Sequence, residues 1–171
     1  MNLYFRLLLV LFKTLFANRI HVLDDSRLSF RVWPFDCDIN FHLTNARYLA
    51  LCDLSRIYYM GQVGVLGKLF KRKWFPVVQS QEVSYFKPVN PLQRVEVLTH
   101  LIYWDEKYWY TEHQFVAADR VCAVVQVRGV FTHGRKVVSM HDVVALADED
   151  VAVPDKPAIV ESWQQLIETK K

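Results

Sequence analysis

Apolar and polar positions divide the chain into a helical stretch followed by a β-rich one. From Asn45 to about Val63 there is no proline, and apolar side chains cover almost the whole circumference of a helix. A helix with so little polar surface is normally buried. The pattern therefore predicts one long buried helix, which we expect to end at the glycines Gly61, Gly64 and Gly67.

Segments rich in Val, Tyr, Phe and Thr predict strands. Short turn sequences such as "DEK", "ADR" and "HGR" separate several of them, and short connections favour antiparallel neighbours. The predicted strands are Arg27–Trp33, Val77–Phe86, Arg94–Trp104, Tyr108–Ala118, Val121–Thr132 and Lys136–Ala145. This order favours an α+β domain in which one antiparallel sheet of five to six strands wraps round the helix. A lone sheet of this size rarely covers such a helix completely, so we expect a homodimer or a dimer of dimers.

The segment Leu3–Phe16 is apolar apart from Arg6, Lys13 and Thr14. It is too short and too interrupted to cross a membrane as a helix, and "ANRIHVLDD" after it is a poor signal-peptide cleavage site. Two interpretations remain open. The helix packs on the domain or on a dimer partner, or it makes peripheral membrane contact with both cations at the lipid headgroups.

The sequence favours three regions: an apolar helix over residues 1–19, the main domain over 20–150 and a helical tail over 151–171. In the tail, Ile159, Trp163 and Leu166 fall on one helical face. We expect that face to pack against the domain.

Composition narrows the function. Of 171 residues 52% are hydrophobic, which is enough for a core, and the net charge of +3 is too small for a nucleic-acid binder with a broad basic surface. The cysteines Cys37, Cys52 and Cys122 are odd in number and lack the spacing of a metal site. We therefore expect reduced thiols, a cytoplasmic protein with possible membrane association, no metal and no cofactor.

Polar chemistry is concentrated in the stretch "FDCDINFHLTNARY", from Phe35 to Tyr48. Together with its flanks, it resembles the signature of the 4-hydroxybenzoyl-CoA-thioesterase-like hot-dog proteins, and most closely the thioesterase superfamily member 6-like subgroup. The positions that match this signature are Arg31, Asp38, His42, Asn45, Tyr48 and Arg56. There are two departures, because Phe41 replaces a glycine and Thr44 replaces an asparagine.

The resemblance implies an acyl-CoA thioesterase, with coenzyme A entering only as part of the substrate. It assigns the catalytic carboxylate to Asp38, as nucleophile or as the base that activates water. The buried helix begins at Asn45, and free N–H groups at a helix start can polarise a thioester oxygen. Asn45 is also a good N-cap. His42 is expected to donate to the substrate carbonyl or to orient Asp38.

Several other residues have a structural and a functional interpretation. We expect Phe41 to narrow the site or to cap the acyl pocket, and Tyr48 to be a core residue beside the substrate. For Lys71 and Arg72, in "KLFKRKW", there are two interpretations. They form part of a solvated charged face, or they bind the phosphates of coenzyme A.

Three more assignments concern charged groups and a thiol near the motif. Asp36 is expected to pair with Arg31. Asp53 and Arg56, three residues apart on the helix, are expected to form a salt bridge. The two acids beside Cys37 should raise the pKa of its thiol and disfavour a thiolate nucleophile.

The predicted reaction is hydrolysis of an acyl-CoA thioester to the free acid and coenzyme A. Two alternatives stay open: a hot-dog enoyl-CoA hydratase-like enzyme, and a non-catalytic acyl-thioester-binding or membrane-associated protein. The aromatic content is suited to a medium or long acyl chain. The sequence does not distinguish coenzyme A from acyl carrier protein as the carrier.

Overall fold

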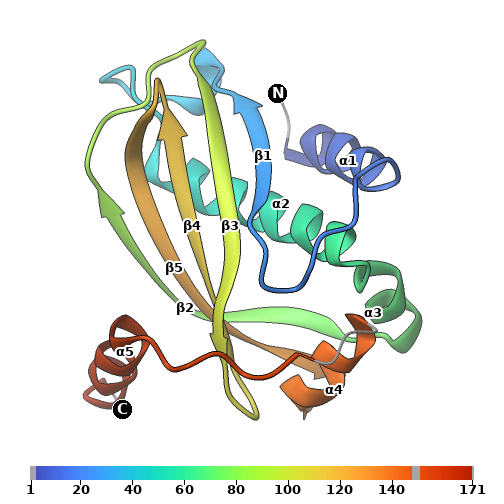
Figure 1. Cartoon of the computed structure of the whole chain (residues 1–171). Helices are drawn as coiled ribbons and strands as arrows, with labels where there is room; N and C mark the ends of the chain where they lie inside the picture. Colours follow the sequence, from blue (N-terminus) through green and yellow to red (C-terminus); the bar gives the residue numbers. More distant parts are fainter. Residues whose placement is uncertain (1–2, 148–150, 171) are drawn as a thin grey trace.

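The computed structural model describes residues 3–147 and 151–170, and in it a curled antiparallel sheet wraps round one long helix, α2 (Asn45–Val63) (Figure 1). The strands are β1 (Ser26–Arg31), β2 (Phe75–Tyr85), β3 (Arg94–Trp104), β4 (Trp109–Ala117), β5 (Arg120–His133) and β6 (Lys136–Val138). Their order is β1-β3-β4-β5-β2, and β6 pairs with β5. The predicted arrangement of sheet and helix is confirmed.

The α2 helix is buried because its residues pack between the sheet and a second helix, α1 (Leu3–Thr14). Tyr48 is 2% exposed, and its ring meets Phe115 of β4 edge-on at a centroid distance of 4.9 Å. The helix ends at Gly64, where φ is 80° and a β-carbon would collide with the Arg19 guanidinium. The predicted end at a glycine is therefore confirmed.

The α2 helix begins at Asn45, as predicted, but its N-cap is a different residue. Thr44 has an extended backbone and occupies the N-cap position, and Asn45 is the first helical residue. The predicted N-cap role of Asn45 is therefore wrong.

The predicted strand Lys136–Ala145 is also wrong beyond its third residue. The chain leaves β6 at Val138 and forms α4 (Met140–Val144) and a short 3-10 turn, η2 (Ala145–Ala147). Ser139 caps α4 by accepting a hydrogen bond from the His141 N–H at 3.2 Å. The β-branched sequence favoured a strand, but this cap and the burial of apolar side chains at helical spacing favour the helix.

The tail helix α5 (Ala158–Glu168) packs on Tyr110 of the sheet, and Gln164 donates a hydrogen bond to the Tyr110 hydroxyl at 2.7 Å. Its inward face carries Val160 and Trp163, whereas Ile159 and Leu166 are exposed. The predicted inward face is therefore correct only for Trp163. The predicted boundary at residue 150 lies outside the described residues.

One more helix, α3 (Leu66–Arg72), follows α2 and leads into β2. Among the helices that the structure describes, none has both the length and the apolar content to cross a membrane.

Candidate active site

The loop between the short 3-10 turn η1 (Pro34–Asp36) and α2 holds the first predicted site residues. An isolated antiparallel β-bridge between Cys37 and Leu43 closes the loop. Within it, the Asp38 N–H donates a hydrogen bond to the His42 carbonyl at 2.9 Å. Phe41 has a left-handed backbone with φ of 57°. This is the conformation that glycine adopts most easily, and Phe41 stands at the glycine position of the motif.

Backbone groups of the same loop hold the Asp38 carboxylate. Its Oδ1 accepts hydrogen bonds from the Asn40 N–H at 2.9 Å and the His42 N–H at 3.2 Å. These bonds stabilise the charged form, and the bond from His42 contributes most to lowering the pKa of Asp38 below 3.8. The residue therefore presents a charged carboxylate at neutral pH.

Asp38 and the start of α2 line the same pocket, which has a volume of about 300 Å³. Its wall contains Asp38, His42, Leu43, Asn45 and Tyr48 from the motif, and Tyr85, Phe86, Lys87 and Pro88 from the end of β2 and the residues after it. The structure thus brings the three predicted catalytic residues and Tyr48 together.

Helix α2 gives this pocket an electropositive end. The first N–H groups of a helix have no acceptor within the helix and carry partial positive charge. The first turn of α2 contains no acidic residue that would neutralise them, and it contains Arg47. A thioester oxygen in the pocket would therefore meet a positive field near Asn45.

Sequence reasoning missed the far wall of the pocket. The ring centroids of Tyr85 and Tyr48 lie 5.2 Å apart in an edge-on contact, and Lys87 adds a cation to the rim. Only the sheet brings these residues beside Asp38, since they lie more than 40 positions further along the chain. No local spacing in the sequence predicts this proximity.

Three other predicted substrate-binding residues do not line the pocket. Phe41 is 70% exposed and is not among the residues that line the pocket. Lys71 and Arg72 are exposed at the end of α3, beyond the opposite end of α2. The 19 residues of α2 separate the two regions by about 28 Å at 1.5 Å per residue. Within one chain, the structure does not bring these cations to Asp38.

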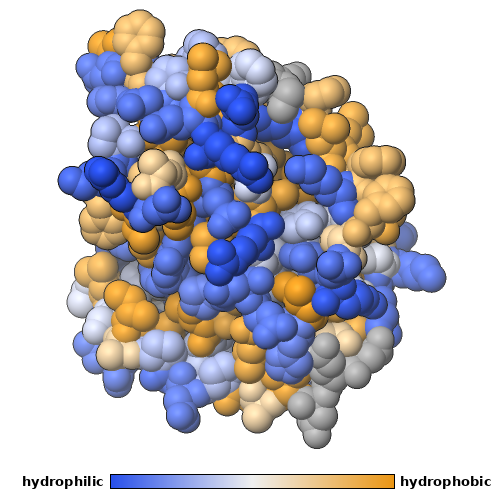
Figure 2. All heavy atoms as spheres, turned by 45° about the horizontal axis from the view of Figure 1, so that its top comes forward, coloured by the Kyte–Doolittle hydropathy of each residue, from blue (hydrophilic) through white to orange (hydrophobic). Residues whose placement is uncertain are grey.

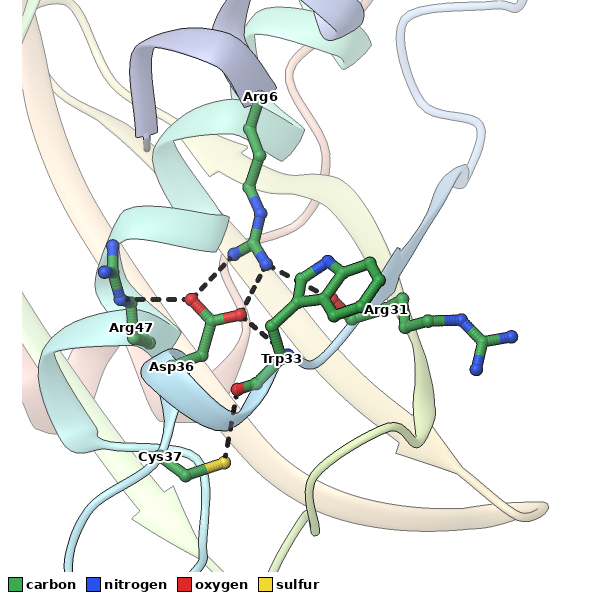
Figure 3. Close-up of polar contacts among 6 residues, drawn as sticks. All are labelled: Arg6, Arg31, Trp33, Asp36, Cys37 and Arg47. Atoms are coloured by element: carbon green, nitrogen blue, oxygen red, sulfur yellow. Dashed lines mark hydrogen bonds and ion pairs between the residues drawn. The ribbon is translucent and has the colours of Figure 1, made fainter. Parts of the chain in front are cut away.

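Asp36 is fully buried in a cluster that joins α1, the motif loop and α2 (Figure 3). Arg6 reaches it from α1: Nη1 donates to Oδ1 at 3.2 Å, and Nη2 pairs with Oδ2. Arg47 of α2 adds a contact from Nε to Oδ1 at 3.3 Å. The predicted Asp36–Arg31 pair is wrong, because the Arg31 side chain points away and only its carbonyl accepts from Arg6, at 3.2 Å.

The same cluster corrects one interpretation of the N-terminal helix. Arg6 is 3% exposed, so it is not available to lipid headgroups. The helix turns this cation inward, and α1 packs beside α2 with Thr14 against Gly61.

Two further predictions about the motif are confirmed. Asp53 and Arg56 form an ion pair, and the Arg56 guanidinium also lies 3.4 Å from Nε2 of the buried His113. The pKa of the Cys37 thiol is raised, mainly by desolvation and further by Asp36 and Asp38. Cys37 is therefore a poor thiolate nucleophile.

A curled sheet round one central helix, with an acid-bearing loop at the helix start, defines a hot-dog protein of the 4-hydroxybenzoyl-CoA thioesterase-like type. The chain belongs to the thioesterase-like superfamily, whose family model matches residues 32–147.

Relatives and a solved structure agree with this membership. The chain is 29% identical over 113 residues to the probable thioesterase YBR096W of Saccharomyces cerevisiae. The aligned region covers 64% of this chain and 49% of the yeast protein. It is 27% identical over 157 residues to protein THEM6 of Drosophila melanogaster, covering 90% of this chain and 79% of the fly protein.

The 4-hydroxybenzoyl-CoA thioesterase from Pseudomonas sp. strain CBS-3 superposes with a TM-score of 0.63 at 15% identity, covering 71% of this chain and 98% of that one. The similarity to that structure concerns the fold. The chain spans about half the length of the yeast relative.

Proposed function

We propose that the chain hydrolyses an acyl-CoA thioester to a carboxylic acid and coenzyme A. One observation carries the proposal: the charged Asp38 carboxylate and the electropositive start of α2 line one pocket, in a chain of the thioesterase-like superfamily.

In this proposal, the thioester carbonyl oxygen faces the N–H groups at the start of α2, which stabilise the negative charge that develops on it. In one route Asp38 attacks the carbonyl carbon and forms a mixed anhydride with the acyl group as the thiol leaves, and water then hydrolyses this anhydride to the acid and free Asp38. In the other route Asp38 takes a proton from a water molecule that attacks the carbonyl carbon, and this proton goes to the leaving thiol. The carbon–sulfur bond breaks, the thiol leaves with a proton, and the water oxygen ends in the acid. His42 lines the same pocket and would donate to the carbonyl or orient Asp38.

The low pKa of Asp38 bears on its role. A general base acts best when its pKa lies near the working pH, whereas the Asp38 carboxylate is stabilised in its charged form by two backbone N–H groups. The carboxylate is therefore charged at neutral pH, and it is a weak base. The same hydrogen bonds lower both the basicity and the nucleophilicity of the carboxylate, so they do not distinguish the two routes.

The same proposal includes a homodimer, because β2 lies at an edge of the sheet. It pairs with β5 along one side, and no strand of the described chain pairs along its other side. Phe75, Val77, Val78 and Tyr85 of β2 are exposed apolar residues. A long apolar edge strand favours pairing with another strand, and a second copy of β2 supplies it.

This dimer would bring Lys71 and Arg72 to the substrate. Antiparallel pairing of two β2 strands about a two-fold axis places the start of one strand opposite the end of the other. Lys71 and Arg72 precede that start, and Tyr85 at that end lines the Asp38 pocket. Lys71 and Arg72 of the partner subunit would then bind the coenzyme A phosphates at the pocket of the first.

The test is thiol release from a series of acyl-CoA esters of increasing chain length, with hydration of an enoyl-CoA measured in parallel. The proposal predicts thiol release that saturates with substrate and depends on chain length. Hydration without thiol release, or tight acyl-CoA binding with neither reaction, would contradict it.

A further inference from the structure

The outer surface of α1 is apolar, although the helix lies at the surface of the molecule. Six of its large side chains, or of those just after it, are more than half exposed: Tyr4, Phe5, Leu8, Phe12, Leu15 and Phe16. Figure 2 shows apolar side chains gathered at the upper right, the side on which α1 lies in Figure 1. We call these six residues the α1 patch. A contiguous apolar patch of this kind on a monomer marks an interaction surface.

The buried Arg6 fixes the direction in which this patch faces. Arg6 contacts both carboxylate oxygens of Asp36 and also the Arg31 carbonyl (Figure 3). Rotating α1 to bury the patch would pull Arg6 out and leave a buried carboxylate with Arg47 as its remaining ion-pair partner, which is costly. The apolar face is therefore held outward by the fold.

The charge of this segment suits an anionic surface. Residues 1–23 contain no aspartate or glutamate, and Lys13 on α1 and Arg19 after it are exposed. Basic side chains beside an apolar helix face are the pattern of helices that lie in the interface of an anionic bilayer. The 12 residues of α1 span about 18 Å, which suits lying in the interface.

The shape beside the patch suits fluid lipid. The apolar surface continues into a hollow of about 550 Å³ between α1 and the region where α2 meets α3. Gly61, Gly64 and Gly67 line the hollow, and Phe12 and Phe70 stand at its walls. Beside Gly67 there is open space, whereas Thr14 packs on Gly61 and Arg19 packs on Gly64. Acyl chains can fill such a hollow without the matched shape that a folded partner would need.

A second copy of the chain is the competing occupant. The proposed dimer uses β2, whereas α1 packs on α2 beside β1, which is the opposite edge of the sheet. The α1 patch therefore remains uncovered in that dimer. We propose that α1 docks the protein on the surface of an anionic lipid bilayer, with the α1 patch among the acyl chains and with Lys13 and Arg19 at the headgroups. This inference does not depend on the proposed hydrolysis.

The experiment is flotation of the full chain with vesicles of phosphatidylcholine alone or mixed with phosphatidylserine. The variant Leu8→Ser/Phe12→Ser removes two exposed apolar side chains, and Ile159→Ser/Leu166→Ser is its matched control on the exposed face of α5. We expect the first variant to partition about 10- to 100-fold more weakly and the control to behave as the wild type. Lys13→Glu should weaken binding to the anionic vesicles and leave binding to the neutral ones nearly unchanged.

Two outcomes would overturn the inference. One is a wild-type chain that does not float with either vesicle, or that floats as well after Leu8→Ser/Phe12→Ser. The other is a fall in oligomer mass caused by Leu8→Ser/Phe12→Ser in the absence of vesicles, which would assign the patch to a second copy. Circular dichroism of each variant separates loss of binding from loss of folding.

Discussion

Single residues set the chemistry of the pocket, and Asp38 shows how far sequence reasoning reaches. Its position in the motif predicted a reactive carboxylate. Its two backbone hydrogen bonds, and therefore the direction of its pKa shift, follow from a turn closed between Asp38 and His42. Lys87 was missed because nothing in its local sequence links it to a loop more than 40 positions earlier.

The pKa of Asp38 predicts a pH profile. The charged form is active and its pKa is lowered from 3.8, so activity should be lost only as the pH falls through a value below 3.8. We expect kcat/KM to show no ionisation of Asp38 between about pH 5 and 8. Comparing the wild type with His42→Gln separates any imidazole contribution. If kcat/KM still fell with pH near neutrality in His42→Gln, the assignment of Asp38 as the charged catalytic group would be contradicted.

Phe41 offers a test of backbone strain at the glycine position of the motif. Its φ of 57° is unfavourable for any residue with a β-carbon. Phe41→Gly and Phe41→Ala both remove the same exposed ring, so their difference isolates the backbone. We expect the glycine variant to be more stable in urea unfolding by about 1 kcal/mol. Equal stabilities would mean that the loop relaxes around the alanine.

At the scale of elements, the spacing of apolar residues predicted the strands and α2 well, because the buried face of each element is visible in its own stretch of sequence. The strand Arg94–Trp104 was predicted with its observed bounds, and α2 ends at a glycine. Periodicity failed at α4, where a serine cap overrides a β-branched sequence. It could not predict the contact of Arg6 with Asp36, which spans 30 positions and exists only once α1 lies against the motif loop.

That contact predicts a large effect on stability. Arg6→Met should lower the free energy of unfolding by about 3–5 kcal/mol, because the buried Asp36 loses its main cation. Lys13→Met, an exposed cation on the same helix, should change it by less than about 0.5 kcal/mol. Chemical denaturation measures both. Similar small changes in the two variants would show that the ion pair is not what holds α1 in place.

At the scale of the whole molecule, the two edges of the sheet have different partners. The β1 edge has α1 and its apolar patch beside it, whereas the β2 edge is long and is not paired with any strand of the described residues. The sequence predicted a dimer from the expected incomplete cover of α2. It could not say which strand would lie at the edge, because strand order follows from packing rather than from local pattern.

The edge assignment predicts that a charge on β2 separates the subunits. Val77→Lys should shift the protein from dimer to monomer and reduce kcat/KM, since the Asp38 pocket lies at the end of the same strand. Val153→Lys, at a similarly exposed valine outside the sheet, is the control. Sedimentation equilibrium gives the mass, and a Val77→Lys protein that stays dimeric would place the interface elsewhere.

The central claim is that Asp38 acts on a carbonyl held at the start of α2, and turnover by Asp38→Asn tests it most directly. The side chain is exposed, so the melting temperature should change by less than about 2 °C and acyl-CoA should still bind. The rate of thiol release should fall by about 100-fold or more. A folded Asp38→Asn protein that releases thiol at the wild-type rate would contradict the account.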